Sequence, residues 1–169
     1  GIQITVDGQM LLLRNQSSLF VRDIKSGRVL HTYSAPAQSI VYHTLDHTSQ
    51  VIAIGHWDGT IELCAFPTFR KLRTLTGHTR PAAWLGFSTD NQALLSNSAN
   101  HSVRLWDWRT GQEKAALHGH IGNHIMLDYS PVNGRFVTAS EDQTLRIWDL
   151  AEVTKPSILH GASDHILTV

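Results

Sequence analysis

Two short stretches, VRLWDW at residues 103–108 and LRIWDL at residues 145–150, are near copies of each other. Each alternates polar with apolar side chains before a Trp-Asp pair, which is typical of a β-strand with one buried face. Trp106 and Trp148 lie 42 positions apart. A strand pattern that returns with the same ending at a fixed distance indicates an internal repeat.

The repeat of 42 residues extends along the chain. One shift places His120 on His78 and Ser140 on Ser98, and a double shift places Asp142 on Asp58. We therefore expect one repeat-built domain with units at about residues 1–34, 35–76, 77–118 and 119–160, with residues 161–169 starting a fifth.

Each unit contains short segments rich in β-branched and aromatic residues. In the fourth unit these segments are residues 124–130, 135–140, 144–150 and 157–160. Turn-forming residues such as Asn133-Gly134 separate them, and this arrangement predicts antiparallel hairpins. Because no segment has the periodicity of an amphipathic helix, we predict an all-β fold.

Gly-His pairs precede both Trp-Asp pairs at the same distance, since His78 leads Trp106 and His120 leads Trp148 by 28 residues. Four strands per unit, with Gly-His near one end and Trp-Asp near the other, resemble the WD-repeat β-propeller family. The resemblance implies a β-propeller built of four-stranded antiparallel blades, with about four blades present as part of a larger ring. The first two units match the pattern less closely.

The resemblance also implies a buried polar network in each blade, which joins the Gly-His histidine, a second-strand serine, an acidic turn residue and the third-strand tryptophan. The matching residues are His120, Ser140, Asp142 and Trp148 in the fourth unit, and His78, Ser98, Asn100 and Trp106 in the third. Buried indole, hydroxyl and imidazole groups each need a hydrogen-bond partner. The second unit keeps Asp58 but has His56 in place of the serine and Cys64 in place of the tryptophan.

The same side chains invite an enzymatic interpretation, because His120, Ser140 and Asp142 have the chemical groups of a catalytic triad. A catalytic site has no reason to recur in every blade, and the chain has no Gly-x-Ser-x-Gly turn. A metal site is also disfavoured. His120 and His124 are four residues apart, which on a strand separates them by about 13 Å. We therefore expect a protein that is not an enzyme and has no metal or cofactor.

Composition narrows the function classes further. The chain has 14 basic and 14 acidic residues and a formal net charge of zero, so we expect no nucleic-acid partner. No apolar run is long enough to span a bilayer, so we expect no membrane insertion. Cys64 is the only cysteine, which excludes an internal disulfide and fits an intracellular, cytoplasmic protein.

In the family, partners bind a face of the propeller formed by the residue before the turn aspartate and by a residue of the first strand. The positions carried over are Trp57, Ala83, Ala99, Ile125 and Glu141. A tryptophan beside a turn aspartate either contacts a partner or stacks on the degenerate neighbouring blade. We expect a non-catalytic scaffold for a protein or peptide partner, or for other domains of a longer parent chain. The alternative is a small-ligand or enzymatic site in the central channel.

The chain starts and stops inside a predicted first strand, and a strand edge left open there invites aggregation. We expect this sequence to be an excerpt of a longer propeller with seven or eight blades. The competing interpretation is a chain that completes its own ring, either alone or with a second copy.

Overall fold

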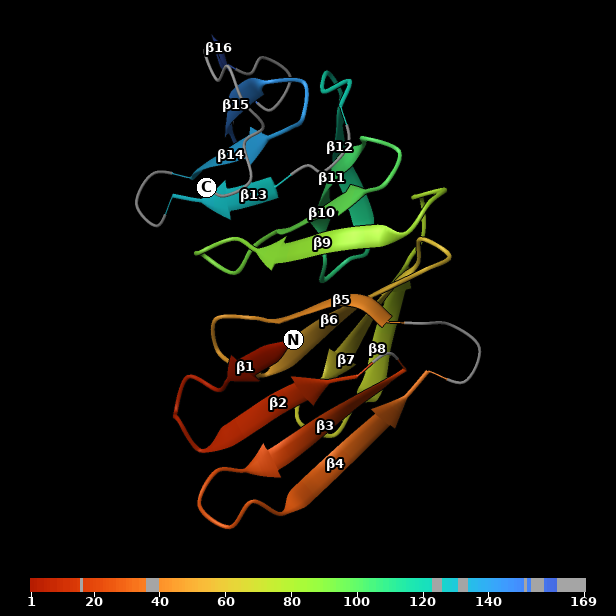
Figure 1. Ribbon diagram of the computed structural model, residues 1–169, viewed down its shortest axis with the longest axis vertical. Helices are drawn as coiled ribbons and strands as arrows, with labels where there is room; N and C mark the ends of the chain where they lie inside the picture. Colours follow the sequence, from red (N-terminus) through yellow and green to blue (C-terminus); the bar gives the residue numbers. More distant parts are fainter. Residues whose placement is uncertain are drawn as a thin grey trace.

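The computed structural model describes residues 1–15, 17–35, 40–122, 126–130, 134–150, 152 and 157–160. Within these ranges the secondary structure consists of β-strands and turns, arranged as four antiparallel sheets of four strands each (Figure 1). The described residues include no helix that is long and apolar enough to cross a membrane. The predicted all-β architecture of four-stranded blades is therefore confirmed.

Each sheet is formed by four strands that are consecutive in the chain. The first sheet contains β1 (Ile2–Ile4), β2 (Met10–Arg14), β3 (Ser18–Asp23) and β4 (Val29–Ser34). The second contains β5 (Ile40–Leu45), β6 (Val51–His56), β7 (Ile61–Ala65) and β8 (Arg70–Leu75). The third contains β9 (Ala82–Phe87), β10 (Leu94–Ser98), β11 (Val103–Asp107) and β12 (Gln112–Leu117). The fourth contains β13 (Met126–Tyr129), β14 (Arg135–Ala139), β15 (Thr144–Asp149) and β16 (Ser157–His160).

The sheets stack face to face in chain order, and a hydrophobic core fills each junction between neighbours (Figure 1). Between the second and third sheets, Leu63 of β7 packs with Trp106 of β11. Between the third and fourth, the matching residues Leu105 and Trp148 occupy the same roles. Trp106 thus faces the preceding sheet, whereas Leu105 on the same strand faces the following sheet.

The repeat is not strictly regular in the first sheet. Ile52 pairs with Cys64, and the residues 42 positions later, Leu94 and Trp106, form the corresponding pair. A shift of 42 would pair Met10 with Arg22 in the first sheet, but Met10 pairs with Asp23. The hairpin between β2 and β3 is therefore one residue shorter than its counterparts. Residues 1–15 therefore correspond to residues of the second sheet that lie 41 positions later in the chain, not the 42 positions that the sequence suggests.

Candidate functional site

The polar network of the third sheet is centred on a hydroxyl group of β10. Trp106 donates its indole N–H to Ser96 Oγ at 2.7 Å, and His78 Nε2 lies 2.7 Å from the same oxygen. His78 Nδ1 contacts Ser102 Oγ at 3.1 Å, and that hydroxyl donates to Asn100 Oδ1 at 2.6 Å. The imidazole is therefore held at both nitrogens inside the blade.

The fourth sheet has the same arrangement with a carboxylate at its end. Trp148 donates to Thr138 Oγ1 at 2.9 Å, and His120 Nε2 lies 2.8 Å from that oxygen. His120 Nδ1 contacts Asp142 Oδ2 directly at 2.9 Å. Thr144 also donates to Asp142, through its hydroxyl at 2.6 Å and its backbone N–H at 3.0 Å. The aspartate thus reaches the imidazole directly, and the Thr144 hydroxyl also lies 3.3 Å from His120 Nδ1, in the position that Ser102 has in the third sheet.

Donor and acceptor counting assigns the tautomer of neutral His78. The Ser102 hydroxyl donates to Asn100, so it accepts from His78 Nδ1–H, and Nε2 is left to accept from Ser96. Burial, with a smaller contribution from Arg104, lowers the pKa of His78 to about 4. Burial also lowers the pKa of His120, against the opposing effect of Asp142. Neutral imidazoles are the form that these networks accommodate.

The network hydroxyl lies two residues earlier in the chain than the family pattern predicts. Ser98 and Ser140 were expected in this role, whereas Ser96 and Thr138 fill it. Trp106 pairs with Leu94, so Ser96 is its diagonal neighbour. Ser98 lies two residues further along the strand, about 13 Å from the position of Leu94. Its hydroxyl instead donates to the carbonyl oxygen of Arg80 at 2.9 Å, and Ser140 Oγ accepts from the Asp142 N–H at 3.3 Å.

The second sheet has lost this network. Ile54 occupies the position of the central hydroxyl and Cys64 that of the tryptophan, and both are fully buried in the core shared with the first sheet. Nearby, Glu62 accepts hydrogen bonds from Tyr33 at 2.5 Å and from Lys71 at 2.6 Å. Because Tyr33 belongs to β4, this carboxylate joins the first sheet to the second. Hydrogen bonds from Lys71 and Tyr33 lower the pKa of Glu62 against the effect of its burial.

The turns between the second and third strands of the sheets lie along the right-hand side of Figure 1. Of the positions expected to contact a partner, Trp57 is 66% exposed, Ala83 and Ala99 are exposed, and Glu141 is half-buried. Ile125 lies outside the described residues. The exposure of Trp57 argues against stacking on the first sheet, which was the other interpretation of this side chain.

The Trp57 turn is fixed against the next sheet. A side chain at Gly59 would lie 2.6 Å from the carbonyl oxygen of His78 and 2.7 Å from that of Arg80, and its φ is +88°. The loop between β8 and β9 contains these carbonyl groups. This loop is hydrogen-bonded to the turn between β10 and β11, since Ala99 N–H donates to the Pro81 carbonyl at 3.3 Å. The exposed side chains are therefore carried by a rigid backbone.

Sequence reasoning missed one exposed apolar residue on this side of the molecule. Ile121 follows the Gly-His pair and is 85% exposed. Its backbone N–H donates to Asp142 Oδ2 at 3.0 Å, which fixes its position in the blade. An isoleucine directly after Gly-His, where the third unit has Thr79, is the signal that could have identified it.

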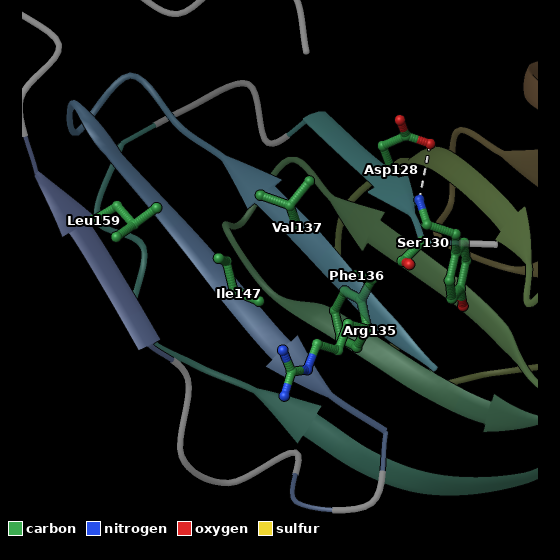
Figure 2. A pocket seen from close by; sticks show the side chains of 8 residues that line it. Asp128, Ser130, Arg135, Phe136, Val137, Ile147 and Leu159 are labelled. Atoms are coloured by element: carbon green, nitrogen blue, oxygen red, sulfur yellow. Dashed lines mark hydrogen bonds between the residues drawn. The ribbon is translucent and has the colours of Figure 1, made fainter. Parts of the chain in front are cut away.

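A hollow of about 380 Å³ lies on the outer face of the fourth sheet (Figure 2). Val137, Ile147 and Leu159 line it, with Asp128 and Arg135 at its margin. The corresponding residues of the third sheet, Leu95, Leu105 and Leu117, are buried against the fourth. The hollow therefore lies on the face of the fourth sheet that corresponds to the face with which the third sheet contacts its next neighbour, the fourth sheet. The described residues contain no group of three or more metal-ligating side chains.

Comparison with known families identifies the repeat. The family model "WD domain, G-beta repeat" matches residues 69–107 and 111–149, two segments that are 42 positions apart. Residues 69–107 and 111–149 are therefore two WD repeats. Each matched WD segment begins at the outermost strand of one sheet and ends at the third strand of the next. One sequence repeat thus contributes strands to two blades.

Solved WD-repeat structures have the same fold. The chain superposes on "Crystal structure of RRP9 WD40 repeats" with a TM-score of 0.82 and 24% identity, over 95% of this chain and 50% of that one. "Structure of U3-55K" gives a TM-score of 0.82 and 23% identity, over 96% of this chain and 51% of that one. This WD-repeat chain spans about half the length of both.

Curated relatives match over shorter segments. Apoptotic protease-activating factor 1 of Danio rerio is 30% identical over 68 residues, which are 40% of this chain and 5% of the relative. Pre-mRNA-processing factor 17 of Saccharomyces cerevisiae is 34% identical over 89 residues, 52% of this chain and 20% of the relative. COMPASS component SWD3 of the same yeast is 26% identical over 113 residues, 64% of this chain and 35% of the relative.

Proposed function

We propose that this WD-repeat chain is a non-catalytic scaffold that binds a protein or peptide partner through the turns between the second and third strands of its sheets. The observation that carries the proposal is the exposure of Trp57 on a turn that Gly59 holds tightly against the third sheet. An exposed indole on a rigid backbone is suited to binding, because anchoring it costs little conformational entropy.

The neighbouring surface supports an apolar partner segment. Ala83, Ala99 and Ile121 are exposed on the same side, and none of them carries a charge. Exposed Asp58 and Arg80 flank this apolar surface, and the turns at the other ends of the strands expose Asp7, Lys25 and Asp90. We therefore expect the partner to place an apolar side chain against Trp57. The zero net charge of the chain favours protein over nucleic acid as the partner.

The polar networks support a structural role for the histidines, and they argue against a catalytic role. His78 and His120 are buried and held at both ring nitrogens by the blade itself. Relatives with names such as pre-mRNA-processing factor and COMPASS component fit a protein that acts within an assembly. An intracellular location remains our proposal, supported by a single cysteine, Cys64, that is buried and free.

The experiment compares binding partners of the wild type with those of Trp57→Ala. Cross-linking and quantitative mass spectrometry would be applied to both, with Leu72→Ala as the matched control, since Leu72 is an exposed apolar residue on β8 of the same sheet. We expect partners to be lost with Trp57→Ala and retained with Leu72→Ala. Equal partner sets for all three proteins would refute the assignment of Trp57 as the anchor.

A further inference from the structure

The outermost strand of each sheet is an open edge, and the four edges differ in how they are protected. β8 carries Arg70, Lys71 and Arg73, and β12 carries Glu113 and Lys114. Charged side chains on an edge strand oppose the addition of another strand. β4 (VLHTYS) and β16 (SILH) have no aspartate, glutamate, lysine or arginine, so this protection is missing on both strands. The surroundings of β4 show what it could bind.

The backbone of β4 presents hydrogen-bonding groups to solvent. Ala35 N–H donates to the Ser17 carbonyl, and the pairing continues through Tyr33 with Leu19 and His31 with Val21. Because hydrogen-bonded pairs alternate in an antiparallel ladder, Thr32 and Ser34 direct their N–H and C=O groups away from β3. Among the described residues, no backbone hydrogen bond to these outward groups is found.

The strand is well anchored despite its open edge. Tyr33 donates to Glu62 of the second sheet at 2.5 Å and its ring lies 5.5 Å from that of Phe69. An added strand would therefore meet a fixed template, so little ordering of β4 would be needed on binding.

The hairpin leading into β4 combines apolar and basic side chains. Ile24, Val29 and Leu30 are each 43–44% exposed, and Leu30 is the extra residue of a β-bulge opposite Val21 and Arg22. Exposed Arg22, Lys25 and Arg28 surround them. Asp23 is the single carboxylate of the hairpin and already accepts two hydrogen bonds from Ser26. The hairpin thus has an excess of positive charge.

We propose that β4 is a second interaction site, which accepts an extended acidic-apolar peptide segment as a fifth strand of the first sheet. The outward groups of Thr32 and Ser34 supply backbone hydrogen bonds, Val29 and Leu30 contact apolar side chains, and Lys25 and Arg28 pair with carboxylates of the segment. The exposed apolar residues favour a peptide over a nucleic acid, for which a basic patch alone would suffice. This site is independent of Trp57.

The test uses a short blocked peptide of alternating valine and threonine that ends in two glutamates, labelled for fluorescence anisotropy. We expect it to bind the whole chain and to slow hydrogen exchange of the Thr32 and Ser34 amides, measured by NMR. Leu30→Glu places a negative charge on the edge and is expected to weaken binding at least about tenfold. Leu72→Glu, at the corresponding bulge position of β8, is the matched control and should leave the affinity unchanged.

Further controls distinguish the proposal from binding at Trp57 and from binding of a nucleic acid. Trp57→Ala should not alter peptide affinity, whereas Lys25→Glu combined with Arg28→Glu should reduce it. A thermal melt of each variant confirms that it is folded. The proposal is overturned by unchanged exchange at Thr32 and Ser34, by equal affinity for a peptide ending in lysines, or by displacement of the peptide by single-stranded oligouridylate. Loss of affinity in Trp57→Ala would assign the peptide to the other site.

Discussion

Trp148 and Thr138 are joined by a hydrogen bond of 2.9 Å from the indole N–H to Oγ1, and His120 shares the same oxygen. Replacing Thr138 with valine keeps its shape but leaves both partners unpaired in a buried site. We expect Thr138→Val to lower the free energy of unfolding by about 2 kcal/mol or more, and Thr138→Ser to restore most of it. Ser140→Ala should cost less, about 1 kcal/mol. Urea denaturation of the three variants provides the measurement.

Asp142 and Asp58 occupy the same turn position but have different partners. Asp142 accepts from Thr144, the Ile121 N–H and His120, whereas Thr60 binds Asp58. Because removing Asp142 leaves buried donors unpaired, Asp142→Ala should destabilise the chain by about 2–3 kcal/mol. We expect about 1 kcal/mol or less for Asp58→Ala. Differential scanning calorimetry would measure both, and equal shifts in melting temperature would contradict the network assignment.

The histidine networks make stability depend on pH. The pKa of His78 is about 4 in the folded chain, below the value of 6.5 for an unperturbed histidine. Between these values the unfolded state binds more protons than the folded state, so stability is complete above pH 6.5 and is lost as the pH falls toward 4. His78 alone should account for a loss of about 1 kcal/mol at pH 5.5 and about 3 kcal/mol at pH 4. Urea midpoints across this range test the slope, and a flat profile would exclude a buried neutral His78.

Gly59 and Gly8 both have positive φ, but their surroundings differ. Carbonyl oxygens lie within 2.7 Å of where a Cβ at Gly59 would be, whereas no atom lies within 4 Å of one at Gly8. Gly8→Ala should therefore cost about 1 kcal/mol for its backbone conformation alone. Gly59→Ala should cost clearly more and also displace Trp57. Thermal melts give the stabilities. The 19F NMR signal of Trp57 in protein labelled with fluorotryptophan, assigned by its loss in Trp57→Phe, would report the displacement.

Much of the fold could be predicted from the sequence because the repeat is nearly exact between the third and fourth units. The 42-residue spacing of Trp106 and Trp148 identified the strands, their order and the family. The family resemblance led to His78, Trp106, His120 and Trp148, but it placed the central hydroxyls on Ser98 and Ser140. The choice between Ser96 and Ser98 could not be made, because both lie on one face of β10 and only the pairing of Leu94 with Trp106 distinguishes them.

The candidate interaction sites were harder to predict. Trp57 was visible as a break in the pattern, but its exposure depends on how the second and third sheets fit at Gly59. The open edge of β4 could not be recognised from composition, because its significance depends on which strand is outermost in each sheet. Contacts between sheets are set by tertiary packing, and a single repeat unit does not contain that information.

The shorter hairpin of the first sheet limits how far its units can be exchanged. Side chains alternate between the two faces of a strand, so a displacement of one residue along β2 would move Leu12 from the buried junction to the outside. Replacing residues 14–18 with the five-residue turn of residues 56–60, as a uniform 42-residue spacing would suggest, would pair Leu13 with Leu19 in place of Phe20 and turn a hydrophobic strand inside out. The blades of this protein are similar in architecture, but they are not modular parts for engineering, and a chimaera must preserve the phase of each hairpin.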